Sequence, residues 1–444
     1  MANKTLSQVI GASNHEIGDI IETKATSLAD GRVLLPLDGT IITPASYTEL
    51  EALLDPGAVA TEQPRLYISS NGDSLEDNAA NKQADKAFIA DDGVRVLSLD
   101  DDLDIWFQDA GAAGEEFGTT QFNSYAISNC AGAADGNEIL CISAAASGGK
   151  QVEGFYTLNG NTFTQATFIS GNDATGAYVS AFCARDGANA RVVCLNTTDT
   201  TIDTYASGTD IGTAWTLSVA YSYTTAPGVT CYTRGSSDDF ATMAAATSLG
   251  VCCTFNSGTT WTENELLPDG ASALQLTVDE TDIVWCINRV TQYEGDKLYK
   301  TTNGTTWTEM LTASEALSYV SDERVTNIKF LDIFSDSSSN LYMLAAGQWG
   351  GGSSVTLSGF LPPLIIFYSE DAGVTWVGHV AVTGVHPQGG NEDWGGYNFM
   401  MSPNCDVLMW TGVVLTNPVI RFMDVTTGLA LPVLPTKKIV ADAP

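Results

Sequence analysis

A short phrase recurs along this chain, and each copy ends in an aromatic residue. The fullest copy carries Ser369, Asp371, Gly373, Thr375 and Trp376 at fixed offsets. Repetition at a near-constant period constrains architecture more than any other sequence signal, because each repeat must bury its apolar face against the next. The other copies run from 254 to 261, from 301 to 307, from 210 to 215 and, most weakly, from 157 to 163.

The spacing of the copies predicts one small sheet per repeat. Phe163, Trp215, Trp261 and Trp307 follow one another at steps of 46 to 52 residues, and a four-stranded propeller blade takes about 40 to 50. The longer step to Trp376 contains a Gly/Ser-rich insert that we interpret as a loop. We therefore predict an all-β chain that forms a six-bladed β-propeller over residues 118–436. The alternative is a seven-bladed propeller, with a further blade assembled from residues 65–117.

The chemistry of the phrase is that of a tight hairpin turn. A short Asp or Asn side chain bonds nearby backbone amides, and the following glycine accepts a positive φ. A Ser or Thr two places earlier adds a local hydrogen bond. The aromatic residue that follows begins the next strand and buries a large apolar surface between sheets.

This phrase resembles the Asp-box of sialidases and of many other propeller proteins. The match is complete at Ser369–Trp376 and partial elsewhere. The resemblance implies a folding motif on the blade hairpin, away from the ligand face, and it carries no chemistry of its own. The residues assigned to it are Ser369, Asp371, Gly373, Thr375, Trp376, Asn256, Gly258, Trp261, Asn303, Gly304, Trp307, Asp210, Gly212 and Trp215.

Residues 1–60 differ from the repeats and predict a strand, an Asp-Gly turn, a second strand and a short helix. The pattern of Asp38 and Gly39 followed by Tyr47 and Leu50 resembles the tail-collar motif of phage fibre and collar proteins. The Trp and Cys common in that motif are replaced here. The resemblance implies an attachment segment over 1–60. The remaining divisions are an acidic connector at 61–117, which contributes a ring-closing strand or an extra blade, and a peripheral tail at 437–444.

Charge excludes several kinds of partner. The chain holds 53 Asp and Glu against 19 Lys and Arg, a net charge of −34. Such a surface repels nucleic acid and anionic membranes. We interpret the acidic run at 100–104 as a solvated surface, since it lacks the spacing of an EF-hand loop. We therefore expect no cofactor, with calcium as the alternative.

The nine cysteines include two pairs with the same separation, Cys130 with Cys141 and Cys183 with Cys194. Their equivalent places in consecutive repeats predict cross-strand neighbours on the first and second strands of a blade. No Cys-x-x-Cys spacing indicates zinc, and the chain has three histidines. We expect small, buried, reduced thiols, with disulfides within blades as the alternative.

The sequence contains no phosphate loop, nucleophile elbow or His-based zinc motif, so we assign no catalytic residues and favour a protein without enzymatic activity. A hydrolase that uses a pair of carboxylates stays open, because acidic residues are plentiful. The collar-like start, the β-rich composition and the lack of a signal-like or membrane-spanning segment favour a virion structural protein of a tailed phage, assembled in the host cytoplasm. We expect a fibre, receptor-binding or decoration role. Its partners would be other virion proteins, through the N-terminal segment, and a host-surface glycan or protein, and the chain would form a homo-oligomer. The alternative is an Asp-box glycan-binding lectin or glycoside hydrolase.

Overall fold

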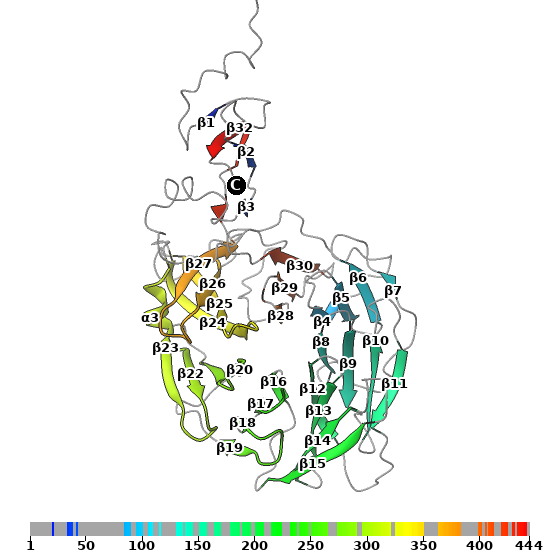
Figure 1. Cartoon of the computed structure of the whole chain (residues 1–444). Coiled ribbons are helices and arrows are strands. Elements are labelled where there is room, and N and C mark those ends of the chain that lie inside the picture. Colours follow the sequence, from blue (N-terminus) through cyan, green and yellow to red (C-terminus); the bar gives the residue numbers. More distant parts are fainter. Residues whose placement is uncertain are drawn as a thin grey trace, which may run out of the picture. The chain divides into compact units, whose positions relative to one another are not determined.

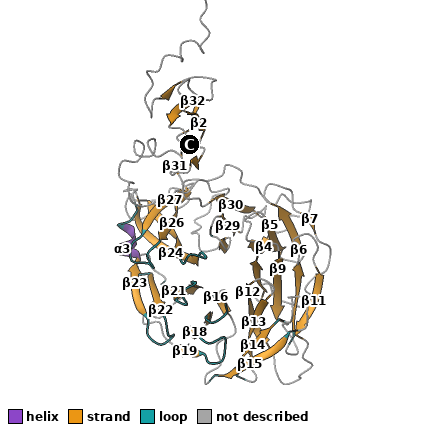
Figure 2. Ribbon diagram, viewed as in Figure 1, coloured by secondary structure: helices purple, strands orange, loops and turns teal. Residues whose placement is uncertain are grey.

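Antiparallel β-sheets make up almost all of the regular structure in the computed structural model of the chain (Figure 2). The predicted all-β class with antiparallel sheets is therefore confirmed. The structure describes residues 20–21, 33–38, 41–42, 84–89, 95–100, 105–109, 115–116, 130–135, 138–144, 151–157, 164–169, 178–186, 189–196, 200–207, 215–223, 231–237, 239–247, 250–264, 273–290, 295–320, 325–349, 363–382, 398–401, 405, 407–412, 419–424, 429–430 and 433–441.

The chain divides into two units. The first comprises Met1–Tyr67 and Asp424–Pro444, and the second comprises Ile68–Met423. In the first unit, strand β32 (Val433–Ala441) lies between β1 (Ile20–Ile21) and β2 (Val33–Asp38), and β3 (Ile41–Ile42) pairs with β31 (Leu429–Ala430). The segment expected to be a peripheral tail thus lies largely within a paired strand. The helix predicted after β3 falls outside the described residues.

The second unit is a succession of sheets, each built from strands that are consecutive in sequence (Figure 1). The earlier sheets consist of β4 (Ala84–Ile89), β5 (Arg95–Asp100), β6 (Ile105–Asp109) and β7 (Glu115–Glu116); of β8 (Cys130–Asp135), β9 (Glu138–Ala144), β10 (Val152–Thr157) and β11 (Thr164–Ile169); and of β12 (Tyr178–Asp186), β13 (Asn189–Asn196), β14 (Thr201–Ala206) and β15 (Thr216–Ser222).

The later sheets follow the same order. They consist of β16 (Cys231–Ser236), β17 (Met243–Thr247), β18 (Gly250–Thr254) and β19 (Thr262–Asn264); of β20 (Ala273–Val278), β21 (Val284–Arg289), β22 (Lys297–Thr301) and β23 (Thr308–Thr312); of β24 (Val325–Ser335), β25 (Leu341–Trp349), β26 (Leu364–Ser369) and β27 (Val377–Val382); and of β28 (Asn398–Met401), β29 (Val407–Gly412) and β30 (Val419–Asp424).

The first strands of neighbouring sheets contact one another. Strand β4 contacts β8, β8 contacts β12, and the series continues through β16 and β20 to β24. Strand β28 of the last sheet contacts β4 of the first. Figure 1 shows these first strands turned towards a common centre, with the fourth strands outside them. Four-stranded antiparallel sheets repeated around a centre are the arrangement of β-propeller blades.

The core lies between the faces of adjacent sheets. One cluster joins β20–β23 to β24–β27 and includes the fully buried Trp285, Phe330 and Phe367. Another joins β16–β19 to β20–β23 and is made of small and medium residues such as Ala244, Cys253 and Cys286. In the described β20–β23 sheet, side chains on both faces are buried, because this sheet packs against one neighbour on either side.

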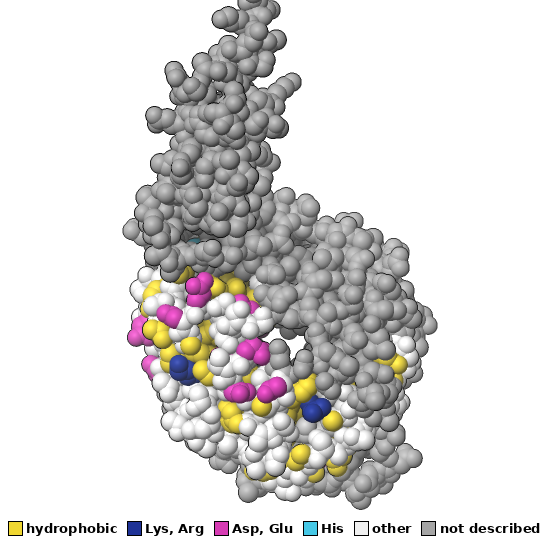
Figure 3. All heavy atoms as spheres, in the orientation of Figure 1, with side chains coloured by type: hydrophobic (Ala, Val, Ile, Leu, Met, Phe, Trp, Pro, Cys, Tyr) yellow, Lys and Arg dark blue, Asp and Glu magenta, His cyan; other side chains and the backbone are white. Residues whose placement is uncertain are grey.

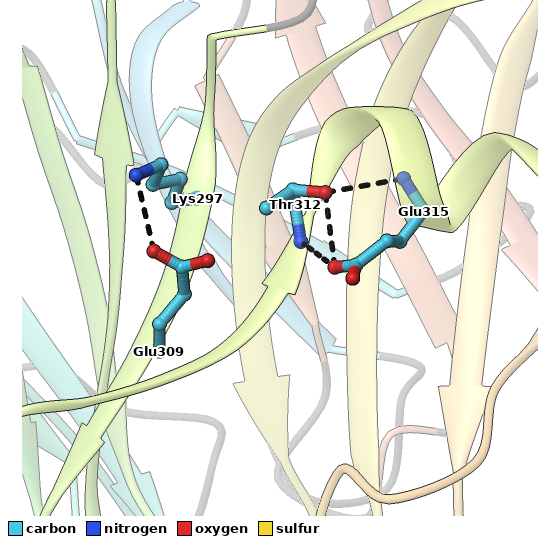
Figure 4. Close-up of polar contacts among 4 residues, drawn as sticks. All are labelled: Lys297, Glu309, Thr312 and Glu315. Atoms are coloured by element: carbon cyan, nitrogen blue, oxygen red, sulfur yellow. Dashed lines mark hydrogen bonds and ion pairs between the residues drawn. The ribbon is translucent and has the colours of Figure 1, made fainter.

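A short helix connects two of these sheets. Helix α3 (Ala313–Leu317) begins with a capping box, in which the Thr312 hydroxyl accepts a hydrogen bond from Glu315 N at 3.2 Å while Thr312 N donates to Glu315 Oε2 at 2.9 Å (Figure 4). The bond from Thr312 N and a second bond from the Thr312 hydroxyl to Glu315 Oε2 hold the pKa of Glu315 below its ordinary value. Beyond the helix, Gly378 N in β27 donates to Tyr319 O at 3.2 Å. Helix and following turn therefore tie one sheet to the outer strand of the next.

Candidate functional site

The turn between β26 and β27 contains the complete copy of the repeated phrase. Asp371 Oδ1 accepts hydrogen bonds from Ser369 Oγ at 2.9 Å and from Thr375 N at 2.8 Å, and Asp371 Oδ2 accepts one from Thr375 Oγ1 at 2.6 Å. Ser369 Oγ in turn accepts the N–H of Gly373 at 2.9 Å. Burial acts to raise the pKa of Asp371, but these donors favour the carboxylate and hold the pKa below its ordinary value. The indole N–H of Trp376 closes the turn by donating to Gly373 O at 3.1 Å.

The turn between β18 and β19 repeats this pattern with an asparagine. Asn256 Oδ1 accepts from Thr254 Oγ1 at 3.0 Å and from Thr260 N at 2.8 Å. Thr254 Oγ1 accepts the N–H of Gly258 at 3.0 Å. The Asn256 amide donates to Thr260 Oγ1 at 2.9 Å, replacing the bond that the Asp371 carboxylate accepts. Trp261 is buried, and its indole N–H has no hydrogen-bond partner among the described residues.

The turn between β22 and β23 is one residue shorter but keeps the central bonds. Asn303 Oδ1 accepts from Thr306 N at 2.8 Å, and Thr301 Oγ1 accepts the N–H of Gly304 at 2.9 Å. Trp307 packs beside a core cluster, and its indole N–H also lacks a partner within the described part of the chain. The shortened turn therefore keeps the side-chain-to-backbone bonds and lacks the indole bond seen at Trp376.

Each turn glycine rests against the preceding sheet. All three glycines have a positive φ, from 70° to 85°, which strains any other residue. At each one, a side chain of the preceding sheet occupies the space that a Cβ atom would need. The turn therefore fixes how closely two sheets approach. The pairs are Gly258 with Thr204 in β14, Gly304 with Thr262 in β19, and Gly373 with Trp285 in β21.

Trp285 is itself held from two other directions. Its Nε1 donates to Asp279 Oδ2 at 2.7 Å, and both groups are buried. The other carboxylate oxygen of Asp279 accepts the backbone N–H groups of Thr281 at 2.9 Å and Ile283 at 3.1 Å. The ammonium of Lys300 lies 5.2 Å from the Trp285 ring centroid, within cation–π range. The surface against which Gly373 packs is thus a fixed ring.

A polar cluster lies at the other end of the β20–β23 sheet. Asp296 stands between β21 and β22, and because β22 runs from there to the 301–307 turn, the two lie at opposite ends of the sheet. Asp296 is fully buried. Its carboxylate accepts the N–H of Val290 at 2.8 Å and that of Phe330 in β24 at 2.8 Å, and its backbone O accepts the N–H of Ala313 at 2.9 Å. One residue therefore joins two sheets and helix α3.

Charges surround this cluster. Burial raises the pKa of Asp296, against the opposing effects of its hydrogen bonds, Arg289 and Lys329. Asp332, two residues beyond Phe330 at a bulge in β24, accepts the N–H of Ile333 at 2.8 Å and is partly exposed. Burial raises the pKa of Asp332 to about 7, and the Arg289 charge opposes that rise. A carboxyl group that titrates near neutrality can exchange protons at physiological pH.

Two of the predicted Asp-box residues, Asp210 and Gly212, lie outside the described residues. Trp215 is buried and packs edge-on against Phe168 of the preceding sheet, with ring centroids 5.6 Å apart. Of the collar-like residues, Asp38 ends strand β2, while Gly39, Tyr47 and Leu50 lie outside the described residues.

No group of metal-binding side chains was found among the described residues. Within the part of the chain that the structure describes, no helix is long and apolar enough to span a membrane.

The cysteines of both pairs lie on the first and second strands of one sheet, as predicted, but they are diagonal and not directly opposite neighbours. Cys141 pairs with Gly132, and Cys194 pairs with Ala181, so both cysteine pairs are offset by two residues. In each hairpin, the centre of the turn lies one residue away from the point midway between the two cysteines in sequence. The strand register therefore places the two cysteines two residues out of alignment. Diagonal neighbours lie about 7–8 Å apart, too far for a disulfide without backbone movement. Cys194, Cys253 and Cys286 are buried and form no disulfide, and burial raises the pKa of these three thiols.

Acidic side chains outnumber basic ones on the described surface seen in Figure 3, as expected from the net charge. One exposed ion pair, Lys297 Nζ with Glu309 Oε2 at 3.0 Å, joins β22 to β23 (Figure 4). Such pairs contribute at most about 1 kcal/mol. We therefore look for electrostatic stabilisation in the buried cluster around Asp296 and not in surface ion pairs.

Comparison with known proteins yields likenesses of structure alone. No family model matches the chain, and no curated protein matches it. The structure of YCF48 bound to D1 peptide has a TM-score of 0.47 at 16 % identity, covering 82 % of this chain and 95 % of that one. The Cps50 (Swd1) β-propeller domain of Myceliophteria thermophila has a TM-score of 0.46 at 9 % identity, covering 82 % and 100 %. The GH74 xyloglucanase of Xanthomonas campestris has a TM-score of 0.41 at 12 % identity, covering 83 % and 56 %. Function cannot be transferred at these similarities.

Proposed function

We propose that the sheets from β4 to β30 are the seven blades of one propeller and that the 254–261, 301–307 and 369–376 turns are Asp-boxes. The alternative blade count is favoured because β4–β7 is a complete sheet of consecutive strands in a region first expected to be a connector. Contact between β28 and β4 brings the last sheet beside the first. The Asp-box assignment is supported by the shared hydrogen bonds and by the glycine seats, the contacts of Gly258, Gly304 and Gly373 with the preceding sheet.

We further propose that the protein is a virion structural component of a tailed phage, with the small unit as its attachment part and the propeller as the displayed part. The observation that carries this is the position of β32 between β1 and β2. The first and last described strands are thereby held in one small unit, the same one that contains the collar-like residues. A unit with its own strand pairing can be anchored to a partner without disturbing the other unit. Its partners would be other virion proteins, and the displayed loops would contact a host-surface glycan or protein.

The test is the protein composition of purified particles from the lysate in which this chain is expressed. We expect peptides of this chain at several copies per particle, since symmetric multiplication strengthens weak contacts. Deleting residues 437–444 should prevent incorporation, because β32 then loses the pairing of Ile439 with β1 and β2. The matched control is Val374→Ala, an exposed change in the other unit, which should be incorporated normally. Absence of the unaltered chain from all particles would refute the proposal.

A glycan-active protein is the second candidate, and one observation favours it. Asp332 is a partly exposed carboxyl group whose pKa is raised by burial to about 7, while the charge of Arg289 opposes that rise. It belongs to β24, one of the first strands that are turned towards the common centre (Figure 1). A carboxyl group protonated near neutral pH can serve as a general acid in glycoside hydrolysis.

Incubation of the full chain with a panel of polysaccharides would test this second candidate. Released sugars that disappear in Asp332→Asn would support the enzyme. Equal release by the variant would exclude Asp332 from the reaction.

A further inference from the structure

Strand β15 (Thr216–Ser222) is the outer strand of its sheet (Figure 1). It pairs with β14 on one side, and within the part of the chain that the structure describes no strand pairs with it on the other. All of its residues are exposed or half-buried, and the apolar side chain of Leu217 is 52 % exposed. An exposed strand edge of this kind is a template for pairing with another chain.

The backbone of β15 directs hydrogen-bonding groups away from its own sheet. Tyr223 N, just beyond the strand, donates to Thr200 O at 3.0 Å. Opposite residues in an antiparallel pair alternate between hydrogen-bonded and non-hydrogen-bonded positions. Ala220 and Ser222 therefore occupy non-hydrogen-bonded positions opposite β14, and their N–H and C=O groups point to the other edge of the strand. Each of these two residues offers one donor and one acceptor to a partner strand.

The outer strands of three other sheets carry a protection that β15 lacks. Strand β19 is three residues long and contains Glu263. Strand β23 contains Glu309, which forms an ion pair with Lys297. Strand β27 is bordered by the turn after α3, where Val320 forms a parallel bridge with Gly378. Short length, charge and a covering segment are the usual means by which proteins prevent pairing at a sheet edge.

Charge indicates which partner fits this edge. Residues 211–233 contain no Asp, Glu, Lys or Arg, while the whole chain has a net charge of −34. The neighbouring outer strand β11 is also uncharged, and its Phe168 packs against Trp215 beside the start of β15. Two copies of this acidic chain repel each other over most of their surfaces, so they approach most closely where the surface is neutral. A basic partner, by contrast, would be attracted to the acidic surface elsewhere.

We propose that β15 pairs antiparallel with β15 of a second copy of this chain, so that two copies form a two-fold dimer through their outer strands. The pairing is self-complementary, since each copy supplies at Ala220 and Ser222 the donors and acceptors that the other requires. This surface goes beyond the proposed function and does not depend on it. The bulge at Ser218, whose hydroxyl donates to Thr204 O at 2.9 Å, limits regular pairing to Val219–Ser222. So short a contact makes the association weak and dependent on concentration.

Analytical ultracentrifugation of the full chain over a range of concentrations tests the dimer. We expect a reversible monomer–dimer equilibrium. Ala220→Lys should raise the dissociation constant by at least about tenfold, because it brings like charges of the two copies together. The matched control is Thr308→Lys, which adds the same charge at an exposed position of the outer strand β23 and should leave the dissociation constant unchanged. A monomer at every concentration, or equal association of Ala220→Lys and the unaltered chain, would overturn the proposal.

Two further measurements use the unaltered chain and so do not depend on how a variant folds. Added salt should strengthen the association, because it screens the repulsion between two chains of net charge −34. Weakening by salt would mean that ion pairs form the contact, which would refute the pairing of neutral strands. Amide hydrogen exchange in the peptide that contains Ala220 and Ser222 should slow as the protein concentration rises. Exchange there that does not change with concentration would also refute the proposal.

Discussion

Replacing Gly373 with alanine tests whether the turn glycine sets the distance between two sheets. A Cβ atom at Gly373 would lie 3.0 Å from Cη2 and Cζ3 of Trp285, a distance that requires one side to move. Trp285 cannot move easily, since it is fully buried and its indole N–H is bound to Asp279. The positive φ of 76° adds backbone strain of about 1–2 kcal/mol for a non-glycine residue. Overpacking adds about 1–3 kcal/mol, so we expect a loss of about 2–5 kcal/mol.

This loss can be measured as a shift in the unfolding midpoint of the full chain. The unfolding entropy scales with size, so 1 kcal/mol shifts the Tm by roughly 1–2 °C in a unit of several hundred residues. Gly373→Ala should therefore lower the Tm by roughly 2–10 °C. Val374→Ala is the control, because Val374 is the next residue in the turn and its side chain is 65 % exposed; its effect should be within about 0.5 kcal/mol. Equal Tm values for the two variants would show that the glycine seat does not constrain the sheets.

Four further outcomes are expected. Trp285→Phe removes the donor to buried Asp279 and leaves a small cavity, so it should cost about 2–4 kcal/mol in denaturant unfolding. Asp371→Ala should cost about 1 kcal/mol near pH 7 by analogy with loss of a capping side chain; because the folded pKa of Asp371 is lowered, the difference should shrink as the pH falls below about 4. Thr312→Ala removes the capping box of α3 and should cost about 0.5–2 kcal/mol in the same assay. The Cys286 thiol, which is buried and has its pKa raised by that burial, should react with a maleimide only after unfolding, as detected by mass spectrometry.

The repeated turns could be recognised from sequence because their hydrogen bonds are local. Ser369, Asp371 and Gly373 bond within a span of a few residues, so the residue types and their spacing carry the geometry. The spacing of the closing aromatic residues likewise predicted a series of small antiparallel sheets. The register between paired strands was less predictable from sequence than the turns. A one-residue difference in the position of a hairpin turn was enough to separate Cys130 from Cys141.

The buried cluster around Asp296 gave no sequence signal. Asp296 belongs to no recognisable motif. Its bond to Phe330 depends on the packing of β24 beside the end of β21, which is a property of two sheets and not of either strand. The hydrogen bond from Phe330 N to Asp296 crosses 34 positions. A single sequence offers no spacing rule for such a contact, and buried carboxyl groups are identified only once the surrounding sheets are placed.

The contacts of the turn glycines show why the turns could be predicted from sequence while the packing between sheets could not. The three turns share their internal bonds, yet the side chains against which they pack are Thr204, Thr262 and Trp285. The turn does not require a particular partner, because its bonds are satisfied within itself. It requires a side chain of the preceding sheet packed against its glycine, and either a threonine or a tryptophan can supply that contact. The turn can therefore recur along the chain while the side chain that packs against its glycine varies. The identity of that side chain differs from one interface between sheets to the next.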